Sequence, residues 1–163
     1  MVVPILNPGF ELPKVLDALQ IQPRNWTGQG NVWVIRSGSS AFGGIHSSEG
    51  NQLAGLGSRG ASIQQAVQLI SGTTYALTFS AATSSEFGSA SLTVSVGDAV
   101  LVVDKPLQSV TMATYLMRFV ADATSKTTNF SAACGYGCVI TVFLDSISLQ
   151  KGNAKLLYIH VLS

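Results

Sequence analysis

Large apolar residues alternate with small polar ones along much of the chain. In segment 74–80, tyrosine, leucine and phenylalanine share one parity, while threonine, alanine and serine take the other. Segments 91–96 and 115–119 repeat this alternation. Because successive side chains of a strand point to opposite faces, each segment predicts a half-buried strand. Three such strands indicate a sheet with one face exposed to water.

Further strands are expected where apolar stretches lie between turn residues. In the last of them the apolar phase shifts after Leu144, which predicts a bulge near Asp145 or burial of both faces. Many short strands without long helices predict an all-β fold, an antiparallel β-sandwich or barrel. The additional expected strands cover residues 31–36, 51–56, 61–70, 100–104, 127–132 and 138–149.

Two segments depart from the strand pattern. A short helix is expected over 12–19, because its leucines and valine would share one face and Pro23 follows. The apolar tail 155–162 predicts one more strand. It belongs to an extension, 151–163, beyond a sandwich expected over 1–150, and it could pair with this sheet or with the edge of another copy.

The composition limits the kinds of partner that the chain is expected to bind. A chain of 163 residues suits one domain. Nine Lys and Arg face eight Asp and Glu, so the chain lacks the cationic field that attracts nucleic acid. No apolar run is long enough for membrane insertion, and no signal peptide is visible at the start. We therefore expect an extracellular protein whose signal was removed, or one exposed on a virion surface.

Several segments carry, in order, a resemblance to a known family. They are the opening 7–11 with Trp26 after it, then 50–53, 63–65, 71–79 and finally 143–149. Together they resemble the galactose-binding-like jelly-roll domains found in carbohydrate-binding modules and in plant cell-wall relatives of that fold. The resemblance implies an antiparallel β-sandwich with a jelly-roll topology. It also implies a non-catalytic carbohydrate-binding or surface-attachment module.

The same resemblance implies a structural calcium that ties the first strand to the last. Carried over residue by residue, it implies carboxylates from Glu11 and Asp145, with backbone oxygens near Gly9 and Asn51. Calcium binds several oxygen ligands of this kind. The alternative is that Glu11 pairs locally and Asp145 accepts backbone hydrogen bonds at the bulge.

Sugar binding commonly uses exposed aromatic rings, helped by amide and charged groups that bond hydroxyls. Trp26 matches the early tryptophan of the family, so it is expected in the core. The candidate ligand-binding residues are Trp33, Phe42 and Tyr136, with Arg36 and His46 and, in support, Glu49, Asn51 and Gln52. For each ring, packing in the core or a loop is an equally good interpretation.

Motifs for catalysis are missing, so the chain is not expected to be an enzyme. The eight carboxylates are scattered singly, and no Gly-x-Ser-x-Gly motif is present. The rival to glycan binding is a self-assembling structural protein, such as a phage or virion capsid decoration protein or a filament or sheath subunit. A surface poor in charge resists such association weakly.

Two smaller motifs remain open. Cys134 and Cys138 could form a disulfide across a short loop or stay as thiols. Asn25 and Asn129 begin tripeptides that match the N-glycosylation pattern, which matters only in a secreted eukaryotic protein.

Overall fold

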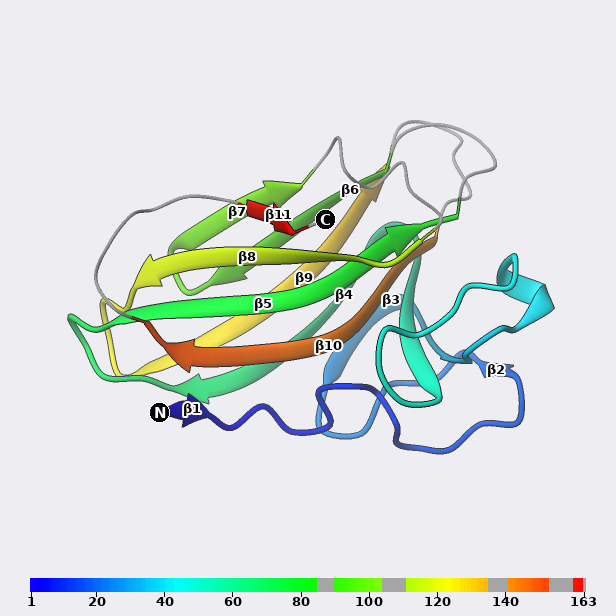
Figure 1. Ribbon diagram of the computed structural model, residues 1–163, viewed down its shortest axis with the longest axis horizontal. Coiled ribbons are helices and arrows are strands. Elements are labelled where there is room, and N and C mark those ends of the chain that lie inside the picture. Colours follow the sequence, from blue (N-terminus) through cyan, green and yellow to red (C-terminus); the bar gives the residue numbers. More distant parts are fainter. Residues whose placement is uncertain (85–89, 104–110, 135–140, 153–159, 163) are drawn as a thin grey trace.

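β-strands make up most of the structure (Figure 1). The computed structural model describes residues 1–84, 90–103, 111–134, 141–152 and 160–162. None of the described residues forms a helix long and apolar enough to cross a membrane. The elements are β1 (Val2–Val3), β2 (Ala18–Leu19), β3 (Thr27–Arg36), the 3-10 helix η1 (Ser40–Phe42), β4 (Gln52–Gln68), β5 (Thr74–Thr83), β6 (Ala90–Val96), β7 (Ala99–Val103), β8 (Ala113–Val120), β9 (Ser125–Cys134), β10 (Thr141–Lys151) and β11 (His160–Leu162).

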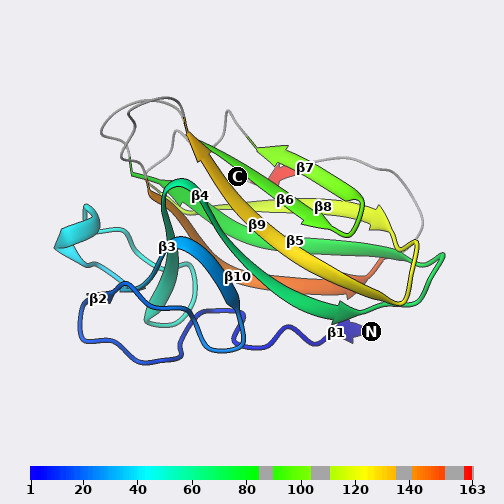
Figure 2. The same ribbon diagram turned by 180° about the vertical axis from the view of Figure 1, so that it is seen from behind.

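The strands form two layers packed face to face. In the front layer, β8 pairs with β5, β5 with β10 and β10 with the first part of β4, whose other edge pairs with the second part of β3. In the back layer, β7 pairs with β6, β6 with β9 and β9 with the second part of β4. All of these pairings are antiparallel, and Figure 2 shows the back layer from its own side. The fold is an antiparallel β-sandwich of the jelly-roll type, as the sequence predicts.

β3 and β4 pass together from one layer to the other. Their register shifts between Gln29 and Asn31, where Gly30 has a φ of 71°. Gly60 on β4 has a φ of 72°, a conformation that side-chain-bearing residues rarely adopt. The sequence predicted separate strands over 51–56 and 61–70, and this is wrong. The glycine-rich corner interrupts the alternation without ending the strand.

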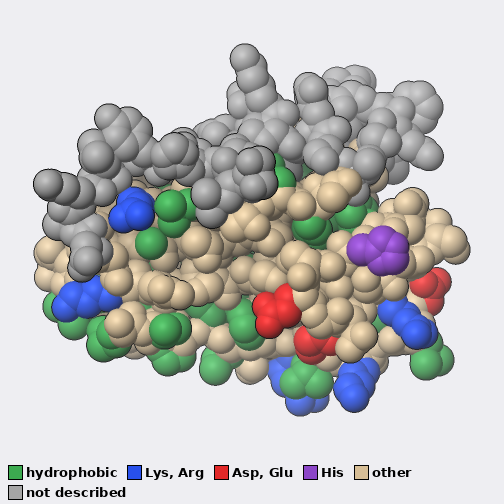
Figure 3. All heavy atoms as spheres, in the orientation of Figure 1, with side chains coloured by type: hydrophobic (Ala, Val, Ile, Leu, Met, Phe, Trp, Pro, Cys, Tyr) green, Lys and Arg blue, Asp and Glu red, His purple; other side chains and the backbone are tan. Residues whose placement is uncertain are grey.

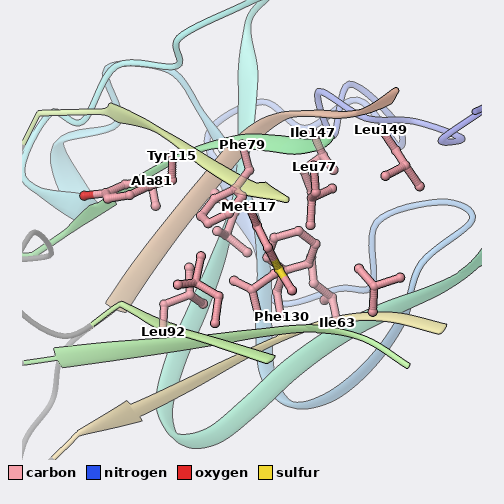
Figure 4. Close-up of a cluster of buried hydrophobic side chains, with 14 of the residues drawn as sticks. Ile63, Leu77, Phe79, Ala81, Leu92, Tyr115, Met117, Phe130, Ile147 and Leu149 are labelled. Carbon is pink, nitrogen blue, oxygen red and sulfur yellow. The ribbon is translucent and has the colours of Figure 1, made fainter. Parts of the chain in front are cut away.

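The main core lies between the two layers and is rich in aromatic rings (Figure 4). Phe79 stacks on Tyr115 with ring centroids 5.4 Å apart and meets the edge of Phe130 at the same separation. Trp26 is 3% exposed, and its indole N–H donates to the Asn7 carbonyl at 3.1 Å. The expectation that Trp26 belongs to the core is confirmed.

The helix expected over 12–19 is wrong. This segment is irregular apart from β2, and Leu16 is 91% exposed. The side-chain amide of Gln52 bonds its backbone instead, accepting from the Val15 N–H at 2.8 Å and donating to the Pro13 carbonyl at 2.9 Å. Backbone groups bonded by a distant side chain have no need of the i to i−4 bonds of a helix.

The last long strand, β10, contains a bulge, and the tail adds one more strand to the sheet. β10 has a register shift between Asp145 and Ser148, and Ser146 has a φ of 51°, so the predicted bulge is confirmed. Residues 142–145 are all buried, so both faces of the strand are covered there. Within the tail, β11 pairs with β8 of the same chain, while 155–159 lie outside the described residues.

Candidate functional site

A second apolar cluster lies on the outer face of the front layer. Side chains alternate along β3, so Trp33 and Ile35 point away from the main core that Val32 enters. Its buried members are Ile35, Ile45, Leu53, Ala82 and Phe143, with Ala18, Trp33, Phe42 and Met112 packed against them. Charged side chains are few on the face shown in Figure 3, where most of the described surface is uncharged.

Three aromatic rings of this cluster form a continuous row in which Phe42 contacts both Trp33 and Phe143. The centroids of Trp33 and Phe42 are 5.3 Å apart with their planes at 64°, and those of Phe42 and Phe143 are 6.1 Å apart at 82°. Phe143 is buried, whereas Trp33 and Phe42 are half-buried. We call these three rings the aromatic platform. Edge-to-face contacts of this kind hold rings in a defined orientation.

Two glycines of β4 make room for the side chains around Trp33. Gly55 is the cross-strand partner of Trp33. A Cβ at Gly55 would lie 2.7 Å from Cδ1 of Ile35 and 3.1 Å from Cγ2 of Thr141, closer than packed side chains allow. A Cβ at Gly57 would lie 3.4 Å from Nε1 of Trp33. The tryptophan therefore lies against bare backbone.

Phe42 is placed by the loop 37–51, which connects β3 to β4. The Gly38 N–H donates to the Ile45 carbonyl at 2.7 Å, and the Gly44 N–H donates to the Ser39 carbonyl at 2.9 Å. Ile45 is buried in the second apolar cluster. The loop thus folds back on the sheet and presents Phe42 beside Trp33.

Asp145 ties this loop to β10, two residues after Phe143. Its Oδ2 accepts from the Ser48 N–H at 2.8 Å, the Glu49 N–H at 3.0 Å and the Ser48 hydroxyl at 3.1 Å. Its Oδ1 accepts from the Ser146 N–H at 2.8 Å. Burial raises the pKa of Asp145 to about 6, although these hydrogen bonds favour the ionised form.

The residues predicted to bind calcium are brought together beside this tie. Oε1 of Glu11 accepts from the N–H groups of Asn51 and Gln52 at 2.8 and 3.0 Å. A Cβ at Gly9 would lie 3.7 Å from Oδ1 of Asp145 and 3.9 Å from Cγ of Glu11. The sequence therefore selected one spatial cluster from four separated positions.

This cluster fits a calcium ion only in part through side chains. Among the described residues, no three His, Cys, Asp or Glu side chains form a group suited to a metal. Donors already point at Oδ2 of Asp145 and Oε1 of Glu11, as the hydrogen-bonding alternative requires. Oδ1 of Asp145 also accepts a hydrogen bond, from the Ser146 N–H, so the second oxygen of Glu11 and nearby backbone carbonyls remain as oxygen ligands of the type that calcium binds.

The predicted sugar-binding residues are only partly brought together. Trp33 and Phe42 meet, but the Arg36 guanidinium donates to the Leu16 carbonyl at 3.3 Å, beyond the end of the platform. His46 is exposed, with Nδ1 3.5 Å from the Ser37 hydroxyl, and none of the described ring contacts includes it. Tyr136 lies outside the described residues, as does Cys138.

Sequence reasoning missed Phe143 and the glycines 55 and 57 as parts of the site. Phe143 could have been found, because it is an apolar residue out of phase with Val142 and Leu144 in the strand where the sequence predicts a bulge or burial of both faces. The role of the glycines depends on their cross-strand partners, which no local pattern gives.

Several solved structures share the fold of this protein. A carbohydrate-binding module of family 61 bound to β-1,4-galactotriose has a TM-score of 0.67 and 17% identity, covering 91% of this chain and 97% of that one. The xylan-binding domain CBM22-1 of Paenibacillus barcinonensis has a TM-score of 0.55 and 12% identity, covering 90% and 93%. The chain therefore has the β-sandwich fold of carbohydrate-binding modules.

The particular family follows from the sequence match. The chain belongs to the protein family of unknown function DUF642, which matches residues 10–136 and is associated with plant cell walls. No curated protein shows significant sequence similarity to the chain.

An enzyme also shares the fold. A cyclase from Fischerella sp. TAU, in complex with 4-(1H-indol-3-yl)butan-2-one, has a TM-score of 0.72 and 19% identity, covering 96% of this chain and 100% of that one.

Proposed function

We propose that this protein is a non-catalytic carbohydrate-binding or surface-attachment module that holds an uncharged glycan on the aromatic platform. The observation that carries the proposal is the pair Trp33 and Phe42, two half-buried rings in contact on the outer face of the front layer. Sugar rings present apolar C–H faces that pack on aromatic rings. A partly exposed pair held by a buried third ring supplies such a surface without needing to rearrange.

The polar groups beside the platform favour a neutral ligand. Asn31 and Thr141 are the cross-strand neighbours of Gly57, one on each side of β4. On the adjoining strands, the half-buried Thr114 lies on the same outer face, paired with the buried Ser80. Amides and hydroxyls can donate to and accept from sugar hydroxyls, but they leave the carboxylate of a uronic acid without a cation.

The non-catalytic part of the proposal is supported by the state of the nearby carboxylate. Asp145 is fully buried and accepts four hydrogen bonds that fix the loop, so it is not presented to a ligand. A general acid or base needs to reach the proton that it transfers. An extracellular location is part of the same proposal, and self-assembly of the chain stays a prediction.

Calorimetric titration of the purified protein tests glycan binding. The ligands are β-1,4-galactotriose, a xylo-oligosaccharide and, as the charged comparison, a galacturonate oligosaccharide. We expect a neutral sugar to bind, and Trp33→Ala to weaken it about tenfold or more, which corresponds to about 1.4 kcal/mol. Leu16→Ala removes an equally apolar but distant exposed side chain and is the matched control. Unchanged binding by a folded Trp33→Ala protein would refute the platform as the site.

We also propose a structural calcium held by Glu11, Asp145 and backbone oxygens near Gly9 and Asn51. Its binding would fasten the first residues to the loop 37–51 and to β10. Chelator should lower the melting temperature of the native protein, and the drop should vanish in Asp145→Asn. A melting curve that chelator leaves unchanged would remove this proposal while leaving glycan binding untouched.

A further inference from the structure

Two tripeptides of the chain match the acceptor pattern for N-linked glycans, and the two asparagines have very different structural surroundings. They begin at Asn25 and at Asn129. A modified asparagine must leave room for a bulky, hydrophilic oligosaccharide after folding. The surroundings of each side chain therefore decide which of the two the native fold can carry.

Asn25 lies in the turn that leads into β3, with its side chain exposed. Its φ is 69°, a left-handed conformation that asparagine adopts more readily than most residues. Its carbonyl accepts from the Gln65 amide at 3.0 Å, whereas its own side-chain amide makes no hydrogen bond within the described part of the chain. Among the described residues the amide nitrogen of Asn25 thus has no partner, and the Gln65 side chain holds the turn through the Asn25 carbonyl.

The two residues after Asn25 keep the acceptor in place. Trp26 is buried against Phe10, with ring centroids 5.5 Å apart, and against Phe130 at 6.1 Å. Thr27, at the position where the pattern requires a hydroxyl, is exposed at the start of β3. A buried middle residue between two exposed ones fixes the turn and leaves both functional side chains on the surface.

Asn129 is in the opposite situation. It lies in the middle of β9, paired with Gln64 of β4 on one side and Ser95 of β6 on the other. Asn129 is only half-buried, but its Oδ1 is buried and has no hydrogen-bond partner in the part of the chain that the structure describes. A glycan there would have to rise from a side chain hemmed in by two neighbouring strands.

We infer that Asn25, and not Asn129, is an N-glycosylation site of this protein. The inference rests on the proposed extracellular location and on a eukaryotic source, since the transferase acts in the eukaryotic secretory pathway. Nδ2 of Asn25 forms a bond to C1 of the first N-acetylglucosamine of a lipid pyrophosphate donor. The bond from C1 to the pyrophosphate oxygen breaks, the lipid pyrophosphate leaves with the electron pair, and the amide proton passes to a base of the transferase.

A glycan at Asn25 leaves the aromatic platform open. Trp33 is eight residues further along β3, beyond the corner at Gly30 where the strand passes to the front layer. The proposed sugar site and the glycan therefore belong to different layers. Removal of the glycan should leave glycan binding by the protein unchanged.

The test is secretion of the full chain from a eukaryotic host behind an added signal peptide, followed by peptide mass spectrometry before and after enzymatic release of N-glycans. Enzymatic release converts a modified asparagine to aspartate and so marks the site. The variants are Thr27→Ala, which keeps Asn25 and its turn, Thr27→Ser, which restores the hydroxyl, and Asn129→Gln as the matched control.

We expect one glycan, at Asn25, that Thr27→Ala abolishes, Thr27→Ser retains and Asn129→Gln leaves unaffected. A secreted, folded wild-type chain without modification at Asn25 overturns the inference, and so does modification at Asn129. Because the added signal directs secretion, the result does not depend on the native location. The proposed function is tested separately by the titrations with neutral sugars.

Discussion

Replacing Asp145 by alanine removes the tie between the loop 37–51 and β10. The carboxylate accepts three hydrogen bonds from Ser48 and Glu49 and one from the Ser146 N–H. Ser48 and Glu49 lie on the loop that presents Phe42 to Trp33. The substitution should therefore lower the stability of the fold and loosen the aromatic platform at the same time.

The size of the effect follows from the donors that lose their acceptor. Each backbone N–H group left without a partner costs about 1–3 kcal/mol, and the N–H groups of Ser48, Glu49 and Ser146 at the low end amount to roughly 3 kcal/mol. We expect Asp145→Ala to lower the free energy of unfolding by about 3 kcal/mol.

Urea denaturation in the presence of chelator measures this loss without any contribution from calcium. Hydrogen exchange of the Ser48 and Glu49 amides reports the loop itself, and both should exchange faster in the variant. Asp145→Asn keeps one acceptor oxygen and should lose less. A loss below about 1 kcal/mol for Asp145→Ala, or unchanged exchange at both amides, would refute the role of this residue as the tie.

Two more predictions concern packing under the indole and pH. Gly55→Ala should lower the free energy of unfolding, measured by urea denaturation, by about 1–3 kcal/mol, because the added methyl group would crowd Ile35 and Thr141. Gly57→Ala should lower it by less than about 1 kcal/mol. Equal losses of stability in the two variants would contradict the packing argument. Because the folded state raises the pKa of Asp145, the part of the stability that is linked to its protonation is complete below about pH 4 and is lost as pH rises through about 6. With chelator present, the free energy of unfolding should therefore contain a fall of about 3 kcal/mol over this range that Asp145→Asn abolishes; the same fall in the variant would assign it to another group.

The strands and the main core could be predicted from the sequence, because the alternation of apolar and polar residues that marks them is a local pattern. The alternation in 74–80, 91–96 and 115–119 corresponds to β5, β6 and β8, each paired with the neighbours that bury its apolar face. Elements whose conformation depends on distant residues could not be predicted in this way. The leucines of 12–19 mimic a helical face, and only the position of Gln52 shows why no helix forms.

The site was predictable as a set of residue types but not as an arrangement. Trp33 and Phe42 could be selected as rings outside the main alternation. Their contact requires the loop 37–51 to fold back on β10, and the bond that secures it joins Ser48 to Asp145, 97 positions apart. Sequence patterns carry little information about contacts at that separation, whereas family resemblance selected both carboxylates of the cluster.

The indole N–H signals of the two tryptophans give the most direct test of the platform as a sugar site. Trp33 is half-buried on the platform, while Trp26 is 3% exposed and bonded to the Asn7 carbonyl, so it is an internal control in the same spectrum. In a titration followed by nuclear magnetic resonance, β-1,4-galactotriose or the xylo-oligosaccharide should shift the Trp33 signal and leave that of Trp26 in place. A sugar that binds while the Trp33 signal stays unchanged, or no shift with either neutral sugar at millimolar concentration, would contradict the account.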